Sequence, residues 1–306
     1  MNQPPPSTSI ALGDLWTEQR RPELQDLDLR STRAIVELMA ADQARLAEAI
    51  SAAAPQIATA IDAVVAQLHK GGRLIYVGAG TAGRLGLLDA AECPPTFNTD
   101  RVVALLAGGE QAFVSSQEAV EDDVLEAGAD VDRLSVGNID AVVGISASGR
   151  TPYTIAAVQH AQQRGAATVG MACNPGAELS QHVDHPIEVV VGPEVIAGST
   201  RLLAGSAQKF VLNTISTVAM IRVGKTYGDL MVDLRATNGK LRHRARRIVA
   251  DATGAAPVAV DQALADSNGV VKTAIVMLVA HVDAEAAGRR LAGHDGVVRA
   301  ALGSDA

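Results

Sequence analysis

The sequence has few aromatic residues and only two cysteines. Phe, Trp and Tyr together make up 2% of the 306 residues, so alanine and the aliphatic residues must fill the interior. Cys93 and Cys173 lie in different segments, and neither has a second cysteine or a histidine at the spacing of metal ligands. This pattern argues against a disulfide framework and against a zinc site, and we expect no bound metal.

Excess positive charge and long apolar runs are also lacking. The formal net charge is -8, which gives no general attraction to nucleic acid or to an anionic membrane. The polar, proline-rich start Met1–Pro6 is unlike a signal peptide, and no uninterrupted apolar run reaches the roughly 18–20 residues that cross a bilayer. We expect a cytoplasmic protein that holds any anionic substrate in a local site. The one basic run, residues 240–247, is interpreted as a solvated helix face.

Hydrophobic residues make up 48% of the chain, enough for a large core. Short apolar runs alternate with helical patterns, and a run buried on both faces of a parallel sheet is continuously apolar. The predicted fold class is α/β, a doubly wound parallel sheet with N-terminal helices and a small C-terminal helical domain. Strands are predicted at 73–77, 102–106, 140–145, 167–172 and 187–191, and helices at 31–70 (interrupted at Pro55), 112–125 and 199–223.

Three parts of the chain differ in pattern. Residues 1–30 are polar with weak periodicity and are interpreted as an arm. Residues 31–235 carry the leading helices and the predicted sheet. Residues 240–306 are helical throughout and are interpreted as a small separate domain, joined through the segment from Asp229 to Asn238.

The first glycine-rich turn, from Gly78 to Gly83, follows a predicted strand and precedes a helical pattern. Its glycines fit the dinucleotide motif G-x-G-x-x-G, which alone is weak. That motif also requires an acidic residue at the end of the next strand, where this sequence has Gly108 and Gly109. Nicotinamide binding and a plain tight turn remain alternatives. We favour a turn that holds a sugar or its phosphate through Gly80 and Thr81.

Two further turns place hydroxyl groups at the start of a predicted helix. Helix N-termini expose unpaired N–H groups, which suit a phosphate, and hydroxyls add donors without net charge. Ordinary helix capping by Ser148 or Thr151, and by Ser199 or Thr200, is the alternative. The candidate binding residues are Ser146, Ser148, Gly149, Arg150 and Thr151 in one turn, and Glu194, Ser199 and Thr200 in the other.

Two glutamates are candidates for proton transfer. Glu92 stands at the end of a helical pattern, just before Pro94 and Pro95, and Glu121 lies in the next helical pattern. Two carboxylates in different surroundings can serve as separate acid and base. The pattern alone is equally compatible with two surface residues.

Taken together, several blocks resemble the N-acetylmuramic acid 6-phosphate etherase family over nearly the whole chain. The most specific is Glu92-Cys93-Pro94-Pro95-Thr96; the glycine turn alone is not specific. The other blocks are Thr17–Arg20, Gly78–Gly86, Ala147–Tyr153, Cys173–Gly176, Gly198–Arg201 with Ala204–Lys209, and Leu230–Leu234 with Ala236–Asn238.

The resemblance implies an SIS (sugar isomerase) fold, a homodimer, and catalysis with neither metal nor nucleotide cofactor. It implies cleavage of the lactyl ether of N-acetylmuramic acid 6-phosphate to N-acetylglucosamine 6-phosphate and D-lactate, in cell-wall recycling. The family's proton-donating glutamate matches Glu92, and its second active-site acid matches Glu121.

The sequence departs from the family pattern at four positions. The family often has Ser where Ala82 and Ala91 stand, Lys where Leu203 stands and Glu where Gly239 stands. These changes affect the expected phosphate contacts more than the expected reaction, since both acids are present.

Two other functions remain open at this point. A non-catalytic sugar-phosphate sensor, like the glucokinase regulatory protein, shares the fold and the Gly-Ser-Thr-Arg block but usually has tandem SIS domains or a fused DNA-binding domain. An aldose–ketose isomerase of the same fold also uses a carboxylate base but releases no lactate.

Overall fold

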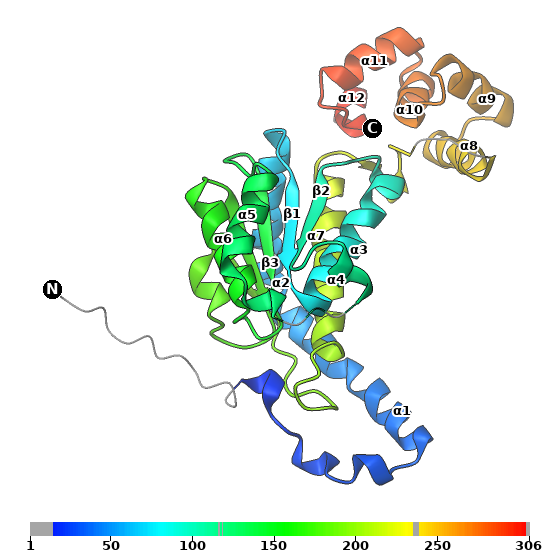
Figure 1. Ribbon diagram of the computed structural model, residues 1–306. Helices are drawn as coiled ribbons and strands as arrows, with labels where there is room; N and C mark the ends of the chain where they lie inside the picture. Colours follow the sequence, from blue (N-terminus) through cyan, green and yellow to red (C-terminus); the bar gives the residue numbers. More distant parts are fainter. Residues whose placement is uncertain (1–14, 116, 118, 235–238, 304–306) are drawn as a thin grey trace. The chain divides into compact units, whose positions relative to one another are not determined.

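The computed structural model describes residues 15–115, 117, 119–234 and 239–303 (Figure 1). They form two compact units. Unit 1 comprises the described residues of Met1–Leu88 and Val103–Ile215, and unit 2 those of Asp89–Val102 and Ser216–Ala306. Helices α3 (Gly80–Phe97) and α7 (Leu203–Arg222) each have residues in both units. These units are defined by contacts within the folded chain and do not test the domain boundaries 1–30, 31–235 and 240–306, which stay predictions.

Unit 1 is built on a five-stranded sheet, as the sequence predicted. The strand order is β2-β1-β3-β4-β5, and β1, β3, β4 and β5 pair in parallel. Each predicted strand is present within three residues of its expected ends. The strands are β1 (Leu74–Gly78), β2 (Val102–Leu106), β3 (Ala141–Ile145), β4 (Ala167–Ala172) and β5 (His185–Glu188).

Helices cover both faces of this sheet (Figure 1). On one face, α5 (Val124–Arg133) and α6 (Pro152–Gln163) pack with Ile75, Val77 and Val142 in one apolar cluster. On the other face, the buried Tyr76 packs against α3 and donates its hydroxyl hydrogen bond to the carbonyl oxygen of Leu212 on α7, at 3.2 Å. Continuous burial of β1 and β3 explains their uniformly apolar sequences.

The leading helices differ from the prediction at Pro55. The chain breaks between α1 (Thr32–Ala41) and α2 (Gln43–His69), at Asp42, and Pro55 lies inside α2. A proline removes one backbone hydrogen bond from a helix. Here the buried face of α2, including Ile57, Ile61 and Val64, packs on the sheet and keeps the helix continuous.

The helical span Thr32–His69 is long and apolar enough to cross a membrane by length and composition, although it contains charged residues such as Asp42 and Arg45. A core helix of a water-soluble protein passes the same test. Arg21 and Arg45 both pair with the buried Asp42, and Arg45 also donates to the carbonyl of Val191 at 2.6 Å, so this span is tied to unit 1 by polar contacts.

Two predicted helices are shorter than expected. The segment 112–125 is divided into α4 (Gln111–Val114), the 3-10 turn η5 (Val120–Asp122) and the start of α5: Ser115 is already extended, and Ala119 is left-handed (φ 65°). The predicted helix 199–223 begins only at Leu203, as α7. Short 3-10 turns also form the arm, at Trp16–Glu18, Pro22–Leu24 and Leu27–Leu29, and another lies at Leu179–His182.

Besides the ends of α3 and α7, the described residues of unit 2 form five helices, in line with the expected helical C-terminal region. They are α8 (Gly239–Thr253), α9 (Pro257–Asp266), α10 (Val271–Ala280), α11 (Ala284–Ala292) and α12 (Val298–Leu302), preceded by a hairpin of β6 (Thr226–Tyr227) and β7 (Leu230–Met231). They share one apolar core. The basic run lies on α8, where Arg242, Arg246 and Arg247 are exposed, as expected for a solvated face; Ala236 to Asn238 fall outside the described residues.

Candidate functional site

The first two predicted turns start side by side. Gly78 at the end of β1 is in register with Ile145 at the end of β3, and a turn follows each. The strand order reverses between β1 and β3, because the chain proceeds outward to β2 on one side and to β4 and β5 on the other. In open parallel sheets such a switch point, at the carboxyl ends of the strands, forms the ligand-binding crevice.

The glycine turn holds α3 close to β1. A Cβ atom on Gly83 would lie 2.4 Å from the carbonyl oxygen of Gly78, so only glycine allows this approach. Gly80 opens α3 with a positive φ of 53° and is exposed, and Thr81 is half-buried next to it. Gly108 and Gly109, both with positive φ, follow β2. A dinucleotide site has an acidic residue at this position, so the described turn lacks that part of the motif. The turn therefore presents backbone and one hydroxyl to the crevice.

The second turn gathers three hydroxyls into one cluster. The Ser146 Oγ atom lies 2.8 Å from Thr151 Oγ1 and 3.3 Å from Ser148 Oγ, and it accepts the Gly149 N–H at 3.0 Å. Thr151 is the N-cap residue of α6, but its side chain makes no cap hydrogen bond. The Arg150 guanidinium lies 3.9 Å from Glu178. Because Thr151 turns its hydroxyl to Ser146, the N-terminus of α6 is left without a side-chain cap and suits an anionic ligand.

Gly149 fixes the path of this turn. Its φ is +72°, and a Cβ atom there would lie 2.4 Å from the Cβ atom of Ala177. We expect Gly149→Ala to displace the turn and to cost about 1–3 kcal/mol of stability or of ligand binding. Gly176→Ala is the matched control, because Gly176 also has a positive φ (+62°) but has open space around it. Measurement of thermal unfolding and of sugar-phosphate affinity checks this; equal effects of the two substitutions would contradict it.

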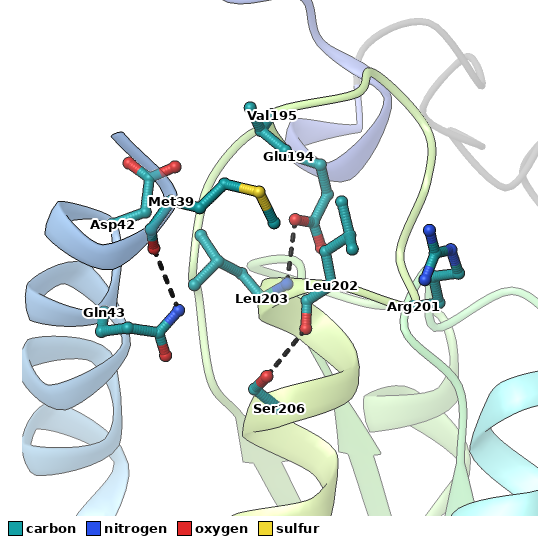
Figure 2. A pocket seen from close by; sticks show the side chains of 9 residues that line it. All are labelled: Met39, Asp42, Gln43, Glu194, Val195, Arg201, Leu202, Leu203 and Ser206. Atoms are coloured by element: carbon teal, nitrogen blue, oxygen red, sulfur yellow. Dashed lines mark hydrogen bonds between the residues drawn. The ribbon is translucent and has the colours of Figure 1, made fainter. Parts of the chain in front are cut away.

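Glu194, in the third turn, is buried rather than a loop surface residue. Its side chain is 1% exposed, and its two carboxylate oxygens accept the N–H groups of Leu203 and Ala204, each at 2.9 Å. Figure 2 shows the hydrogen bond to Leu203. Burial raises the pKa of this carboxyl, while the two hydrogen bonds act in the opposite direction. Glu194 thus caps the N-terminus of α7. The sequence had suggested Ser199 or Thr200 as the possible cap, but both residues precede the helix and are half-buried.

A small open cavity of about 190 Å³ borders Glu194 (Figure 2). It lies between the α1–α2 junction and the start of α7. Its lining combines acidic, basic and apolar groups: Met39, Asp42, Gln43, Glu194, Val195, Arg201, Leu202, Leu203 and Ser206.

Removal of the Glu194 carboxylate is expected to destabilise the protein. Glu194→Ala leaves two buried N–H groups at the start of α7 without their acceptor, and each such group costs about 1–3 kcal/mol. Glu194→Gln keeps one acceptor oxygen and should cost less. Asp283→Asn is the control, because Asp283 caps α11 at an exposed site and Asn caps equally well. Urea unfolding measures the free energy of unfolding of each variant, which should be lowest for Glu194→Ala. A Glu194→Ala protein as stable as the wild type would contradict the capping role of Glu194.

Glu92 lies on α3, in unit 2, and is exposed. The helix does not end there, as the sequence suggested, but continues through Pro94 and Pro95 to Phe97. The Thr96 hydroxyl donates to the carbonyl oxygen of Glu92 at 2.9 Å and so stabilises this proline-containing turn. The other candidate residues belong to unit 1.

The neighbouring Cys93 is buried, and burial together with the Asp89 carboxylate raises the pKa of its thiol to about 12. Burial also raises the pKa of Cys173, whose Sγ atom lies 3.9 Å from the carbonyl oxygen of Ala204. Thiols of this kind are not nucleophilic at neutral pH. Neither thiol is therefore a candidate nucleophile or base in this state.

Glu121 lies in the short turn η5 and not on a helix, and its side chain is exposed. Asp123, two residues later, caps α5 by accepting the Glu126 N–H at 2.9 Å. On the other side, the Arg84 guanidinium of α3 donates to the carbonyl oxygens of Ala112, Phe113 and Ser115. Arg84 thus holds the segment that leads to Glu121 against the glycine turn.

Sequence reasoning assigned no role to Arg84 or to Asn174. The Asn174 side chain is buried, and its Nδ2 atom donates to the carbonyl oxygens of Ala147 (3.1 Å) and Ser148 (3.4 Å) in the second turn. Both residues lie in blocks that carry the family resemblance, which is the signal that could have drawn attention to them.

Comparison with known proteins agrees with this geometry. The family model of the glucokinase regulatory protein N-terminal SIS domain matches residues 56–162, and the SIS domain model matches residues 122–221. A phosphoheptose isomerase from Francisella tularensis superposes with a TM-score of 0.50 at 19% identity, over 63% of this chain and 99% of that one, a likeness that shows the fold.

Full-length relatives are far more similar in sequence. An N-acetylmuramic acid 6-phosphate etherase from Rubrobacter xylanophilus is 60% identical over 95% of this chain and 97% of its own length. Proteins of the same name from Streptomyces avermitilis and Mycolicibacterium smegmatis are 55% and 50% identical, over 97% and 96% of this chain and 96% and 99% of theirs.

Proposed function

Because this chain belongs to the N-acetylmuramic acid 6-phosphate etherase family, we propose that it is a carbon–oxygen lyase that acts on a sugar phosphate in cell-wall amino sugar recycling. It cleaves the lactyl ether of N-acetylmuramic acid 6-phosphate to N-acetylglucosamine 6-phosphate and D-lactate. The near full-length identity to etherases favours this function over the sensor, which shares the fold and the Gly-Ser-Thr-Arg block, and over the isomerase, which shares the fold.

One structural observation supports the location of the site. The glycine turn and the hydroxyl cluster both begin at the β1/β3 switch point, where Gly78 and Ile145 are in register. The Ser146–Thr151 turn offers hydroxyls and the uncapped N-terminus of α6 to a phosphate without adding net charge. This suits a chain whose formal net charge is -8. The 6-phosphate therefore belongs at this turn, with Gly80 and Thr81 beside it.

The catalytic groups that this chemistry requires are a base and an acid. Opening of the sugar ring exposes the aldehyde at C1, which acidifies the proton on C2. Glu121 takes this proton as the base, the C2 electron pair forms a double bond to C3, and the C3–O bond to lactate breaks. Glu92 donates a proton to the departing lactate oxygen. Acid–base help of this kind is typically worth about 10²–10⁴-fold.

Hydration completes the reaction. Water adds its oxygen to C3 of the unsaturated aldehyde and gives one proton to the Glu92 carboxylate, while a proton returns to C2, which gives N-acetylglucosamine 6-phosphate. No atom changes its net oxidation state between substrate plus water and the two products, so carboxylates suffice for every step. The proton that Glu121 gained is the one that it can return.

A second subunit is part of this proposal. Glu92 and Glu121 are both exposed in the single chain, whereas acid–base catalysis benefits from the exclusion of water. Large apolar side chains that lie close to Glu121 in the sequence are also exposed, among them Val114 (83%) and Leu125 (84%). Patches of this kind mark interaction sites. A homodimer accounts for both observations, and we place it in the cytoplasm. Sedimentation should give twice the chain mass of 31.5 kDa.

The four departures from the family pattern differ in burial. Ala82 and Leu203 are both buried, on α3 and at the start of α7, whereas Ala91 and Gly239 are exposed. The backbone N–H of Leu203 is bonded to Glu194, a contact that does not depend on the side chain at position 203. The departures leave the turns and both acids in place.

The test of the proposed function is lactate release from N-acetylmuramic acid 6-phosphate by the purified protein, with EDTA present and no nucleotide added. We expect lactate and N-acetylglucosamine 6-phosphate in equal amounts. Binding of the substrate without release of lactate would favour the sensor instead, and conversion to a ketose would favour the isomerase.

A further inference from the structure

One residue of the N-terminal arm is buried at the candidate site. The turn Trp16–Glu18 lies at the start of the described chain, and within it Trp16 is 46% exposed while Thr17 is 0% exposed. A polar side chain that is fully buried is expected to have a hydrogen-bond partner.

That partner is the amide of Asn174, which follows β4. The Thr17 N–H donates to Asn174 Oδ1 at 3.2 Å, and Asn174 Nδ2 donates to Thr17 Oγ1 at 3.0 Å. The two residues therefore hold each other by a reciprocal pair of hydrogen bonds, both of them buried. The same Nδ2 atom reaches the carbonyl oxygens of Ala147 and Ser148, in the hydroxyl turn.

Thr17 also contacts the third turn. Its carbonyl oxygen accepts the Gly198 N–H at 3.2 Å, immediately before Ser199 and Thr200. Gly198 has a φ of +75°, and a Cβ atom there would lie 2.9 Å from the Glu18 carboxylate, so the arm packs closely on this turn. A single residue thus connects the turn after β3 with the turn before α7.

We propose that Thr17 is a positioning residue: together with Asn174 it clamps the Ser146–Thr151 and Gly198–Thr200 turns in the relative position that binds the substrate phosphate. This inference rests on the proposed function for the identity of the ligand. Neither turn is held by a strand or helix along its own length, so the distance between their donors depends on contacts of this kind. A displacement of about 1 Å in a group that positions the substrate can reduce the activity by up to about 100-fold.

The experiment compares full-length variants with and without the clamp. Thr17→Val keeps the size of the side chain and removes the hydroxyl, and Asn174→Leu removes all four side-chain hydrogen bonds. Thr17→Ser is the conservative variant that retains the hydroxyl. Thr59→Val is the matched control, because the Thr59 hydroxyl bonds only to the Pro55 carbonyl within α2, on an exposed face.

We expect Thr17→Val and Asn174→Leu each to raise KM for ether cleavage, and the Kd of N-acetylglucosamine 6-phosphate by titration calorimetry, about 10-fold. The change in kcat should stay below about 3-fold, since the clamp touches no reacting atom. Thr17→Ser and Thr59→Val should resemble the wild type. Because the Thr17 hydroxyl acts through its hydrogen bond to Asn174, the double variant should be no worse than Asn174→Leu alone.

A different pattern would overturn the proposal. If Thr17→Val lowers the thermal midpoint and the active fraction but leaves KM and Kd at wild-type values, Thr17 is only structural. If Asn174→Leu does not fold, the proposal is tested by Thr17→Val and Thr17→Ser alone: equal KM and Kd values for these two variants would overturn it. The calorimetric Kd needs no turnover, so a wild type that binds the sugar phosphate but releases no lactate contradicts the proposed function, and the clamp is still judged by its own variants.

Discussion

Glu92→Gln is expected to lower the rate of lactate release by about 10²–10⁴-fold, the usual contribution of one acid–base group. Gln has the same shape and cannot donate a carboxylic proton, so the lactate oxygen must leave without protonation. Glu92 is exposed on α3, and its replacement should leave the thermal midpoint almost unchanged. Steady-state lactate assays measure the effect. A Glu92→Gln enzyme with the full rate would refute the acid role.

The control is Glu285→Gln, a change of another exposed glutamate in unit 2, which pairs with Arg289 on α11. It should leave the rate unaltered. A second substrate sharpens the assignment: an ether at C3 whose leaving group is a phenol needs less protonation as it departs. If Glu92 is the acid, this substrate should recover much of the rate lost in Glu92→Gln. An equal loss with both substrates would contradict the role.

Glu121→Gln is expected to abolish removal of the C2 proton and to lower lactate release by about 10²–10⁴-fold. The measurement is the exchange of the C2 hydrogen of N-acetylglucosamine 6-phosphate with deuterium in D₂O, followed by NMR. Asp122→Asn is the control, since Asp122 is the exposed neighbour in the same 3-10 turn. Exchange at the wild-type rate in Glu121→Gln would exclude Glu121 as the base.

The two variants together separate the two roles. With Glu121 as base and Glu92 as acid, Glu92→Gln retains C2 exchange while lactate release falls, and Glu121→Gln loses both. The opposite pattern would assign the acid role to Glu121 and the base role to Glu92. Both substitutions remove one exposed charge from the same protein, so a general electrostatic effect would change the two activities alike.

The sequence by itself determined the fold class and the place of the turns. Continuous apolar runs such as 141–145, alternating with helical patterns, allow only a parallel sheet with helices on both faces, and this sheet is present. Glycine at positions 78 and 83 marks the close approach of α3 to β1, because no other residue fits there. The family resemblance, carried by Glu92–Thr96 and the other blocks, is confirmed by the relatives.

Some boundaries could not be read from local patterns. Pro55 normally ends a helix, but burial of Ile57 and Ile61 against the sheet keeps α2 continuous, and packing of distant segments is invisible in a local window. Likewise, the helical pattern of 112–125 did not show that the helix stops at Val114 and that Glu121 lies in a 3-10 turn after the left-handed Ala119. The roles of Glu92 and Glu121 themselves stay predictions until the variants are measured.

Only the tertiary structure decided which polar groups hold which turns. Glu194 reads as a surface residue or a sugar ligand in the sequence, and it is the buried cap of α7. Thr17 lies 157 positions from Asn174, so no local pattern connects them. Secondary structure depends on neighbours along the chain, whose spacing the sequence displays. The hydrogen bonds of a binding site join residues that meet only after the sheet has formed, and their pairing is therefore a property of the folded molecule.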